Sequence, residues 1–165
     1  MKLRSFVAGF AVPLLLLTLL PATPALADSR CYKYRYAERR FVQRMNAARS
    51  NNGRVRLSLD PEAGKVARRH AVEMANKNLL YHTPSSSLKW RITRWSVLGE
   101  NVGVGSTVRS LHRAFMNSPA HKSNILYSSF RHVGVGTIRK GGRLWVTVVF
   151  ESSRDPGTRL RMPNC

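Results

Sequence analysis

The sequence predicts an α+β protein with a single domain, in which helices cover a small antiparallel sheet. Helical spacing of apolar residues dominates residues 41–117, whereas residues 131–151 consist of two β-rich runs joined by a Lys-Gly-Gly turn. Residues 28–165, which follow a predicted leader, have the length of one ordinary domain. Because a sheet must bury its apolar face, we expect the helices to pack against it.

The first expected helix lies in "RFVQRMNAARSNNG". Phe41, Met45 and Ala48 are spaced as i, i+4 and i+7, which places them on one face of a helix. Asn52 and Gly53 follow and are typical of a helix end.

A second helix is indicated after the extended stretch at residues 56–59. Asp60 is a good N-cap, Pro61 suits the first helical position, and Glu62 places an acid in the first turn. His70 lies one position from the apolar face and is interpreted as a packing residue rather than a ligand. The apolar face consists of Val66, Ala67, Ala71, Met74 and Ala75.

The middle of the chain predicts two further helices and a strand. A short helix is expected in "SSSLKWRITRW", residues 85–95, and another over residues 107–117, which Pro119 should end. A strand is expected in "LGENVGVG", residues 98–105. Neither "VGVG" stretch continues into a nucleotide-binding loop, so these glycines are interpreted as strand positions where packing is close. The apolar positions of the later helix are Val108, Leu111 and Phe115.

The first residues predict secretion. Residues 1–27 combine a short basic region, an apolar run and a "PALA" sequence, which together are typical of a signal peptide cleaved near Ala27. The apolar run is shorter than the roughly 20 residues that span a bilayer, and no later stretch approaches that length. The expected product is a released extracellular protein without a membrane span, and we expect it to be a monomer.

The two cysteines lie near the ends of the expected mature chain. Cys31 falls in an N-terminal segment, residues 28–35, and Cys165 in a C-terminal tail, residues 154–165. In an oxidising compartment an even pair predicts one disulfide, although unpaired or intermolecular thiols remain an alternative. The folded domain is expected between these segments, over residues 36–153.

Charge is the strongest compositional signal. The chain has 28 lysines and arginines against 8 aspartates and glutamates, a net charge of +20 at neutral pH. The basic residues are spread along the chain without a nucleic-acid-binding motif, so no specific nucleic-acid partner is expected. Such a protein adheres to polyanions through its field, for example to anionic lipid headgroups or wall polymers. The alternative is a merely soluble surface.

Four ordered motifs point to a known family: "YHT", "GEN", "FMNSPAHKSNIL" and "VGVG…LWVTVVF". Together they resemble the CAP superfamily of cysteine-rich secretory, antigen 5 and pathogenesis-related proteins, most closely its bacterial secreted branch. The resemblance covers roughly residues 36–151. It implies a single α-β-α sandwich with a central antiparallel sheet flanked by helices and a shallow cleft. In animal and plant members, two histidines and two glutamates of that cleft can hold a divalent metal.

The resemblance assigns candidate cleft residues in this chain. His82, Glu100 and His121 match the two histidines and the first glutamate, whereas Ser118 stands where the second glutamate is expected. Phe115 replaces a bulky tryptophan of the family. Two imidazoles and one carboxylate form a legitimate zinc set with an open fourth position. The alternative is a metal-free hydrogen-bonded cluster, and both remain open.

Three functions are therefore compatible with the sequence. The favoured one is a non-catalytic binding module of the extracellular space or cell envelope, with anionic polymers or lipids as partners. The second is a hydrolase that uses either zinc or Ser118 with His121 and Glu100. The third is a scaffold that recognises another protein. Three aromatic side chains near the cleft are interpreted as core residues and not as site residues: Tyr81, Trp90 and Trp95.

Overall fold

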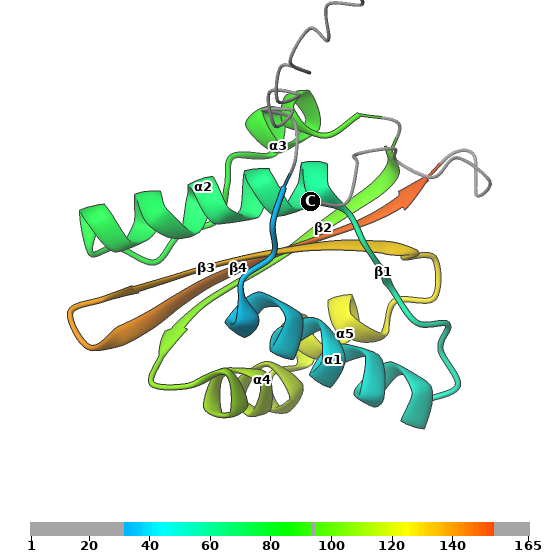
Figure 1. The fold of residues 1–165 in the computed structure, drawn as a ribbon. Helices are drawn as coiled ribbons and strands as arrows, with labels where there is room; N and C mark the ends of the chain where they lie inside the picture. The colour runs from blue at the N-terminus through cyan, green and yellow to red at the C-terminus, as the bar shows by residue number, and fades with distance from the viewer. Residues whose placement is uncertain (1–31, 94, 154–165) are drawn as a thin grey trace, which may run out of the picture.

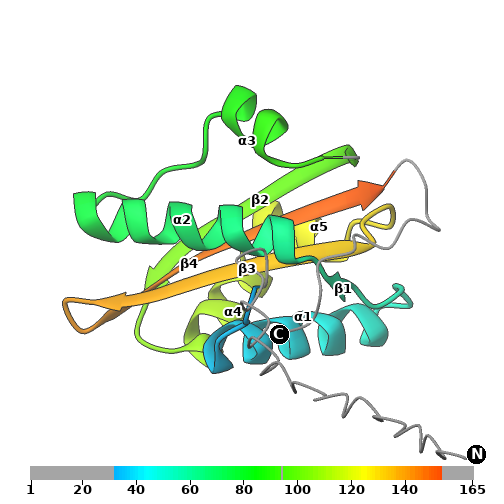
Figure 2. The ribbon, with the colours of Figure 1, turned by 45° about the horizontal axis from the view of Figure 1, so that its top comes forward.

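The computed structural model describes residues 32–93 and 95–153. Helices lie on both faces of one sheet, with α2 and α3 on one side and α1, α4 and α5 on the other (Figures 1 and 2). This arrangement confirms the predicted α+β class and the α-β-α sandwich. In chain order the elements are α1 (Tyr36–Asn51), β1 (Ser58–Leu59), α2 (Pro61–Lys77), α3 (Ser85–Arg91), β2 (Trp95–Gly105), α4 (Val108–Asn117), α5 (Pro119–Leu126), β3 (His132–Lys140) and β4 (Arg143–Ser153).

The sheet has the strand order β1-β3-β4-β2. The long strand β4 is central and pairs antiparallel with both β2 and β3, as expected. The hairpin turn at Gly141 and Gly142 has positive φ angles of 58° and 70°, a conformation that suits glycine. The predicted extended stretch contributes only the two-residue strand β1, which pairs parallel with β3 at the sheet edge.

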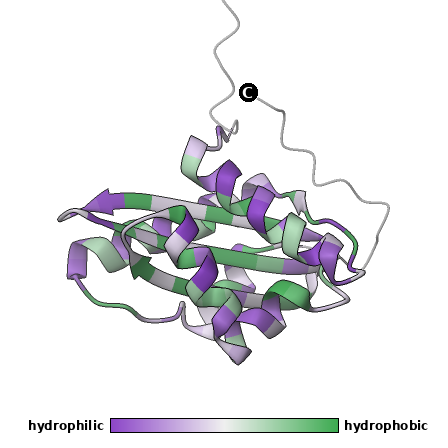
Figure 3. Ribbon diagram, turned by 90° about the horizontal axis from the view of Figure 1, so that it is seen from below, coloured by the Kyte–Doolittle hydropathy of each residue, from purple (hydrophilic) through white to green (hydrophobic). Residues whose placement is uncertain are grey.

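Two apolar layers fill the sandwich. The larger layer lies between the sheet and the helices α1, α4 and α5, and the smaller one lies beneath α2 and α3. In Figure 3, hydrophobic positions recur along the strands, whereas the helices carry many hydrophilic positions. The centre of the larger layer contains Phe41, Met45, Leu111, Phe115, Ile125, Phe130, Val133, Val135, Val146, Val148 and Phe150.

The helix α2 begins and packs as its sequence predicts. Asp60 Oδ1 accepts a hydrogen bond of 2.7 Å from the backbone N–H of Glu62, and Pro61 occupies the first turn. His70 is buried, with Nε2 2.7 Å from the carbonyl oxygen of Tyr81, which confirms its packing role. The helix ends at Asn78, which adopts the left-handed conformation at φ 50°.

Glycines of β3 allow α2 to approach the sheet closely. A Cβ atom on Gly134 would lie 2.1 Å from the backbone carbon of Ala63, and one on Gly136 would lie 2.0 Å from the backbone nitrogen of Arg68. No side chain fits in that space, so the backbone of α2 rests on the strand. This confirms the interpretation of the second "VGVG" stretch as a site of close packing.

The region around Pro119 differs from the prediction. α4 ends at Asn117 as expected, but Pro119 also begins the new helix α5, because proline suits a first helical turn. Ser118 is the cap residue of both helices. The core assignment of Trp90 was wrong: this side chain is 88% exposed on α3, because only Leu88 of that short helix is buried.

Several predictions fall on residues outside the described ranges. The leader at residues 1–27, the cysteines Cys31 and Cys165 and the tail at residues 154–165 belong to this group. Their predicted cleavage and disulfide stay predictions. Within the described ranges, no helix is both long enough and apolar enough to cross a membrane.

Candidate functional site

The predicted cleft residues come from three separate elements. His82 lies in the loop between α2 and α3, Glu100 lies in β2, and His121 lies in the first turn of α5. The Nδ1 atom of His82 is 2.9 Å from Oε1 of Glu100. The same carboxylate oxygen accepts a 2.9 Å hydrogen bond from the backbone N–H of Thr83. The structure therefore brings His82 and Glu100 together, as the motifs predicted.

The two side chains of this pair differ in how deeply they are buried. The side chain of Glu100 is only 6% exposed, whereas that of His82 is 60% exposed. Glu100 Oε2 is buried and has no hydrogen-bond partner within the described part of the chain. A buried carboxylate with one free oxygen and one occupied oxygen anchors the loop and presents the His82 imidazole to solvent.

His121 is held by packing rather than by the carboxylate. Its ring stacks on Phe115, with ring centroids 4.7 Å apart and an interplanar angle of 29°. Burial, and to a smaller extent the nearby charge of His82, lowers the pKa of His121. Its Nδ1 atom is buried and lacks a hydrogen-bond partner among the described residues. The lowered pKa favours the neutral imidazole at neutral pH.

Two asparagines connect the elements of the site, and neither was predicted from the sequence as a site residue. Asn101 Nδ2 donates to the carbonyl oxygen of His121 at 3.0 Å. Asn124 Nδ2 lies 2.9 Å from Asn101 Oδ1 and 3.2 Å from the carbonyl oxygen of Glu100. These bonds fasten α5 to β2. Asn101 lies in the "GEN" motif and Asn124 in the "FMNSPAHKSNIL" motif, and that position is the signal that could have indicated them.

In the part of the chain that the structure describes, His82, Glu100 and His121 are not gathered into a three-donor metal site. Within residues 32–93 and 95–153, no group of three or more histidine, cysteine, aspartate or glutamate side chains is placed to hold a metal ion. His82 Nδ1 and one oxygen of Glu100 are occupied by each other. Of the predicted zinc set of His82, Glu100 and His121, the structure shows only the contact between His82 and Glu100, and zinc binding stays a prediction.

Ser118 has a structural role at the helix junction. Its backbone N–H donates to the carbonyl oxygen of Ala114 at 3.1 Å, and its own carbonyl oxygen accepts from Lys122 N–H at 2.8 Å. Among the described hydrogen bonds, none joins the Ser118 hydroxyl to His121. The bonds that are present position the start of α5, and with it His121.

Comparison with known proteins decides the family. Residues 42–150 match the sequence profile described as "CAP: Cysteine-rich secretory protein family". The chain belongs to the CAP family. It is 32% identical over 115 residues to the uncharacterized protein YkwD of Bacillus subtilis (strain 168), an alignment that covers 66% of this chain and 44% of that protein. The chain spans less than half the length of the curated relatives it matches.

Solved structures agree with this CAP fold. An outer surface protein from Borrelia burgdorferi superposes with a TM-score of 0.65 at 16% identity, over 70% of this chain and 92% of that one. An extracellular protein containing an SCP domain from Bacillus anthracis superposes with a TM-score of 0.64 at 23% identity, over 71% of this chain and 40% of that one. At such identities these structures confirm the fold.

Proposed function

We propose that this CAP protein is a secreted, non-catalytic binding module that attaches to anionic polymers or lipids of the extracellular space or cell envelope. The observation that carries the proposal is that the acidic side chains are few and that several of them are buried or already bound. The chain has only 8 acidic residues, and Glu38, Asp60 and Glu151 are fully or almost fully buried. The carboxylate of Glu100 lies 2.9 Å from His82 and is therefore already engaged. Few acids remain to neutralise the basic surface.

The described ion pairs involve few of the basic residues. Glu38 pairs with Arg68, and Glu73 pairs with Lys77 and lies 3.9 Å from His70. The chain carries 28 lysines and arginines. A surface with so little compensation creates a positive potential that attracts polyanions and is weakened by salt.

Two further observations support attachment outside the cell. Residues 1–27 have the pattern of a cleaved leader. Proteins with a similar fold include one named an outer surface protein and one named extracellular. The attachment proposed here does not require the candidate cleft residues His82, Glu100, Ser118 and His121. Binding is favoured over hydrolysis because Ser118 caps two helices and no described hydrogen bond joins its hydroxyl to His121 as in a nucleophile–base pair.

The proposal is tested by cosedimentation of the purified protein with vesicles. Phosphatidylglycerol-containing vesicles are compared with purely zwitterionic ones across a series of salt concentrations, and purified cell walls are tested with and without their anionic polymers. We expect retention on the anionic surfaces only, decreasing steeply with salt. His121→Ala serves as the control and should bind equally well. Equal retention on neutral and anionic surfaces would contradict the proposal.

A further inference from the structure

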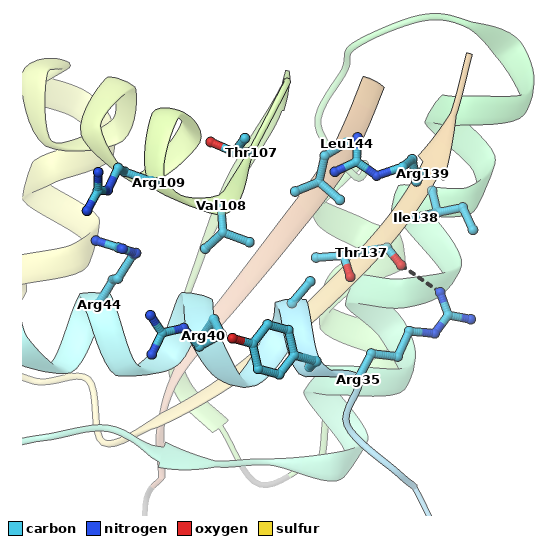
Figure 4. A pocket seen from close by; sticks show the side chains of 12 residues that line it. Arg35, Arg40, Arg44, Thr107, Val108, Arg109, Thr137, Ile138, Arg139 and Leu144 are labelled. Carbon is cyan, nitrogen blue, oxygen red and sulfur yellow. Dashed lines mark hydrogen bonds between the residues drawn. The ribbon is translucent and has the colours of Figure 1, made fainter. Parts of the chain in front are cut away.

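A group of arginines lines a cavity on the side of the molecule formed by α1, the start of α4 and the β3–β4 hairpin (Figure 4). The cavity has a volume of about 470 Å³. Its apolar wall includes Val108, Ile138 and Leu144. The cavity is not apparent from the sequence, because its basic residues come from separate elements. They are Arg35, Arg40, Arg44, Arg109 and Arg139.

A second basic cavity adjoins the first. It has a volume of about 430 Å³ and shares Arg35 and Tyr36 with the first cavity. The side chain of Tyr36 is exposed. The two cavities together are called the arginine groove below. The other lining residues of the second cavity are Lys33, Tyr34, Arg39 and Arg68.

The arginines of the first cavity lack neutralising carboxylates. Within residues 32–93 and 95–153, none of the five forms an ion pair with an acidic side chain. Arg35 Nη1 donates to the carbonyl oxygen of Thr137 at 2.8 Å, a bond drawn in Figure 4. Arg139 donates to two backbone carbonyl oxygens. Carbonyl oxygens orient a guanidinium group but do not cancel its charge.

Among the described residues, Arg44 and Arg109 have no side-chain hydrogen bond or ion pair, whereas Arg35 and Arg139 donate to backbone carbonyl oxygens. Figure 4 shows their guanidinium groups pointing toward one another, Arg44 from α1 and Arg109 from α4. Arg44 also contributes, after burial, to lowering the pKa of His112. Glu38 is the acid nearest in sequence, but it is fully buried and bound by Arg68. Converging like charges without a counter-charge are relieved when an anion binds between them.

The shape and chemistry of the groove indicate the class of ligand. A guanidinium fork donates two parallel hydrogen bonds to a phosphate, a geometry that lysine does not offer. Two adjoining cavities with arginines in each fit a ligand that carries more than one anionic group.

We propose that the arginine groove binds a flexible polymer of phosphate groups, with successive phosphates seated in the two cavities on either side of Arg35 and Tyr36. This inference rests on the proposed function, because it names one ligand class and one surface for anion binding. It differs from adhesion by net charge in that the arginines of the groove contribute most of the affinity.

The test compares two double variants that remove the same charge. Arg44→Gln/Arg109→Gln alters the groove, whereas Arg54→Gln/Arg56→Gln alters exposed arginines near the opposite end of α1. The probe is long-chain inorganic polyphosphate, with orthophosphate and phosphatidylglycerol vesicles as further arms. We expect the groove variant to lose affinity for polyphosphate by about tenfold or more and the control variant by less than about threefold at the same salt concentration. Orthophosphate should bind far more weakly than polyphosphate.

A third variant tests the geometry of the guanidinium groups. Arg44→Lys/Arg109→Lys keeps the charge and removes the fork, so we expect an intermediate loss of affinity. Equal losses of polyphosphate affinity in the groove and control variants would overturn the assignment of the groove as the binding site. The proposed function would remain. Failure of the unaltered protein to bind any anionic probe would instead refute the proposed function itself. Groove-dependent binding to phosphatidylglycerol vesicles that is tighter than binding to polyphosphate would overturn the assigned ligand class.

Discussion

The Nδ1 atom of His82 lies 2.9 Å from Oε1 of Glu100, although 18 residues separate them in the sequence. Glu100 also accepts the backbone N–H of Thr83. One buried carboxylate in β2 thus fastens the loop that follows α2 to the sheet. The contact between His82 and Glu100 therefore stabilises the position of this loop and also fixes where the imidazole of His82 lies.

Removal of this carboxylate should loosen the loop and destabilise the fold. Glu100→Ala leaves the Thr83 N–H without its acceptor, and we expect the free energy of unfolding to fall by about 1–3 kcal/mol. Chemical denaturation measures this change. Glu73→Ala, which removes a partly exposed acid on α2, is the matched control and should cost less than about 0.5 kcal/mol. Equal effects of the two variants would contradict the anchoring role of Glu100.

The cleft should bind zinc only weakly. His82 Nδ1 and Glu100 Oε1 are occupied by each other, and no third donor of the described chain completes a site. Calorimetric titration of chelator-treated protein should therefore give the same weak signal for the unaltered protein and for His121→Ala. A tight site that disappears in His121→Ala would instead establish the three-ligand zinc set.

Stability should depend on pH through the buried acid Glu151. Burial and the charge of Asp60 raise its pKa from an ordinary 4.5 to about 8, and Glu62 adds to this effect. The cross-strand neighbour His132 offers little compensation, because burial and Arg131 lower its pKa. Between pH 4.5 and about pH 8, Glu151 keeps its proton in the folded protein, whereas the same carboxyl group releases it in the unfolded chain. Stability therefore falls as the pH rises through this window.

Glu151→Gln removes this proton linkage. We expect the variant to be more stable than the unaltered protein by about 1–3 kcal/mol at pH 8, with a smaller difference at pH 5. Thermal or chemical unfolding at several pH values measures the change. A variant whose stability follows the same pH dependence as the unaltered protein would show that another group is responsible.

Replacement of Arg49 by lysine should destabilise the fold. This fully buried guanidinium connects α1 to the segment that leads from α5 into β3. Arg49→Lys cannot reproduce the planar set of donors, and we expect a loss of about 2–4 kcal/mol in the free energy of unfolding. Exposed Arg54→Lys, at the same end of α1, should change stability by less than about 0.5 kcal/mol. The accepting carbonyl oxygens belong to Val55, Ile125, Tyr127 and Phe130, at 2.7–3.1 Å.

Similar losses in Arg49→Lys and Arg54→Lys, measured by chemical denaturation, would contradict this account of the buried guanidinium.

Local sequence patterns predicted the parts of the fold that depend on neighbouring residues. Asp60, Pro61 and Glu62 indicated the start of α2, and the glycines of the second "VGVG" stretch indicated close packing. The family motifs placed His82 and Glu100 in one cleft, and the structure confirms that these two side chains meet.

The remaining features depend on tertiary contacts that spacing does not encode. The parallel pairing of β1 with β3 involves two residues, too few to show an alternating pattern. Pro119 is compatible with both the end of one helix and the start of another, so α5 was missed. Arg44 and Arg109 are 65 positions apart and converge only because α1 packs beside α4. Their joint role was therefore invisible in the sequence.

The central claim is that the basic surface, and not the polar cleft, attaches this protein to anionic material. The most direct measurement is the affinity of the unaltered protein and of His121→Ala for long-chain polyphosphate as a function of salt concentration. We predict that both lose affinity by tenfold or more between about 50 and 200 mM salt, with the same slope. Affinity that is independent of salt, or that disappears in His121→Ala, would contradict the claim.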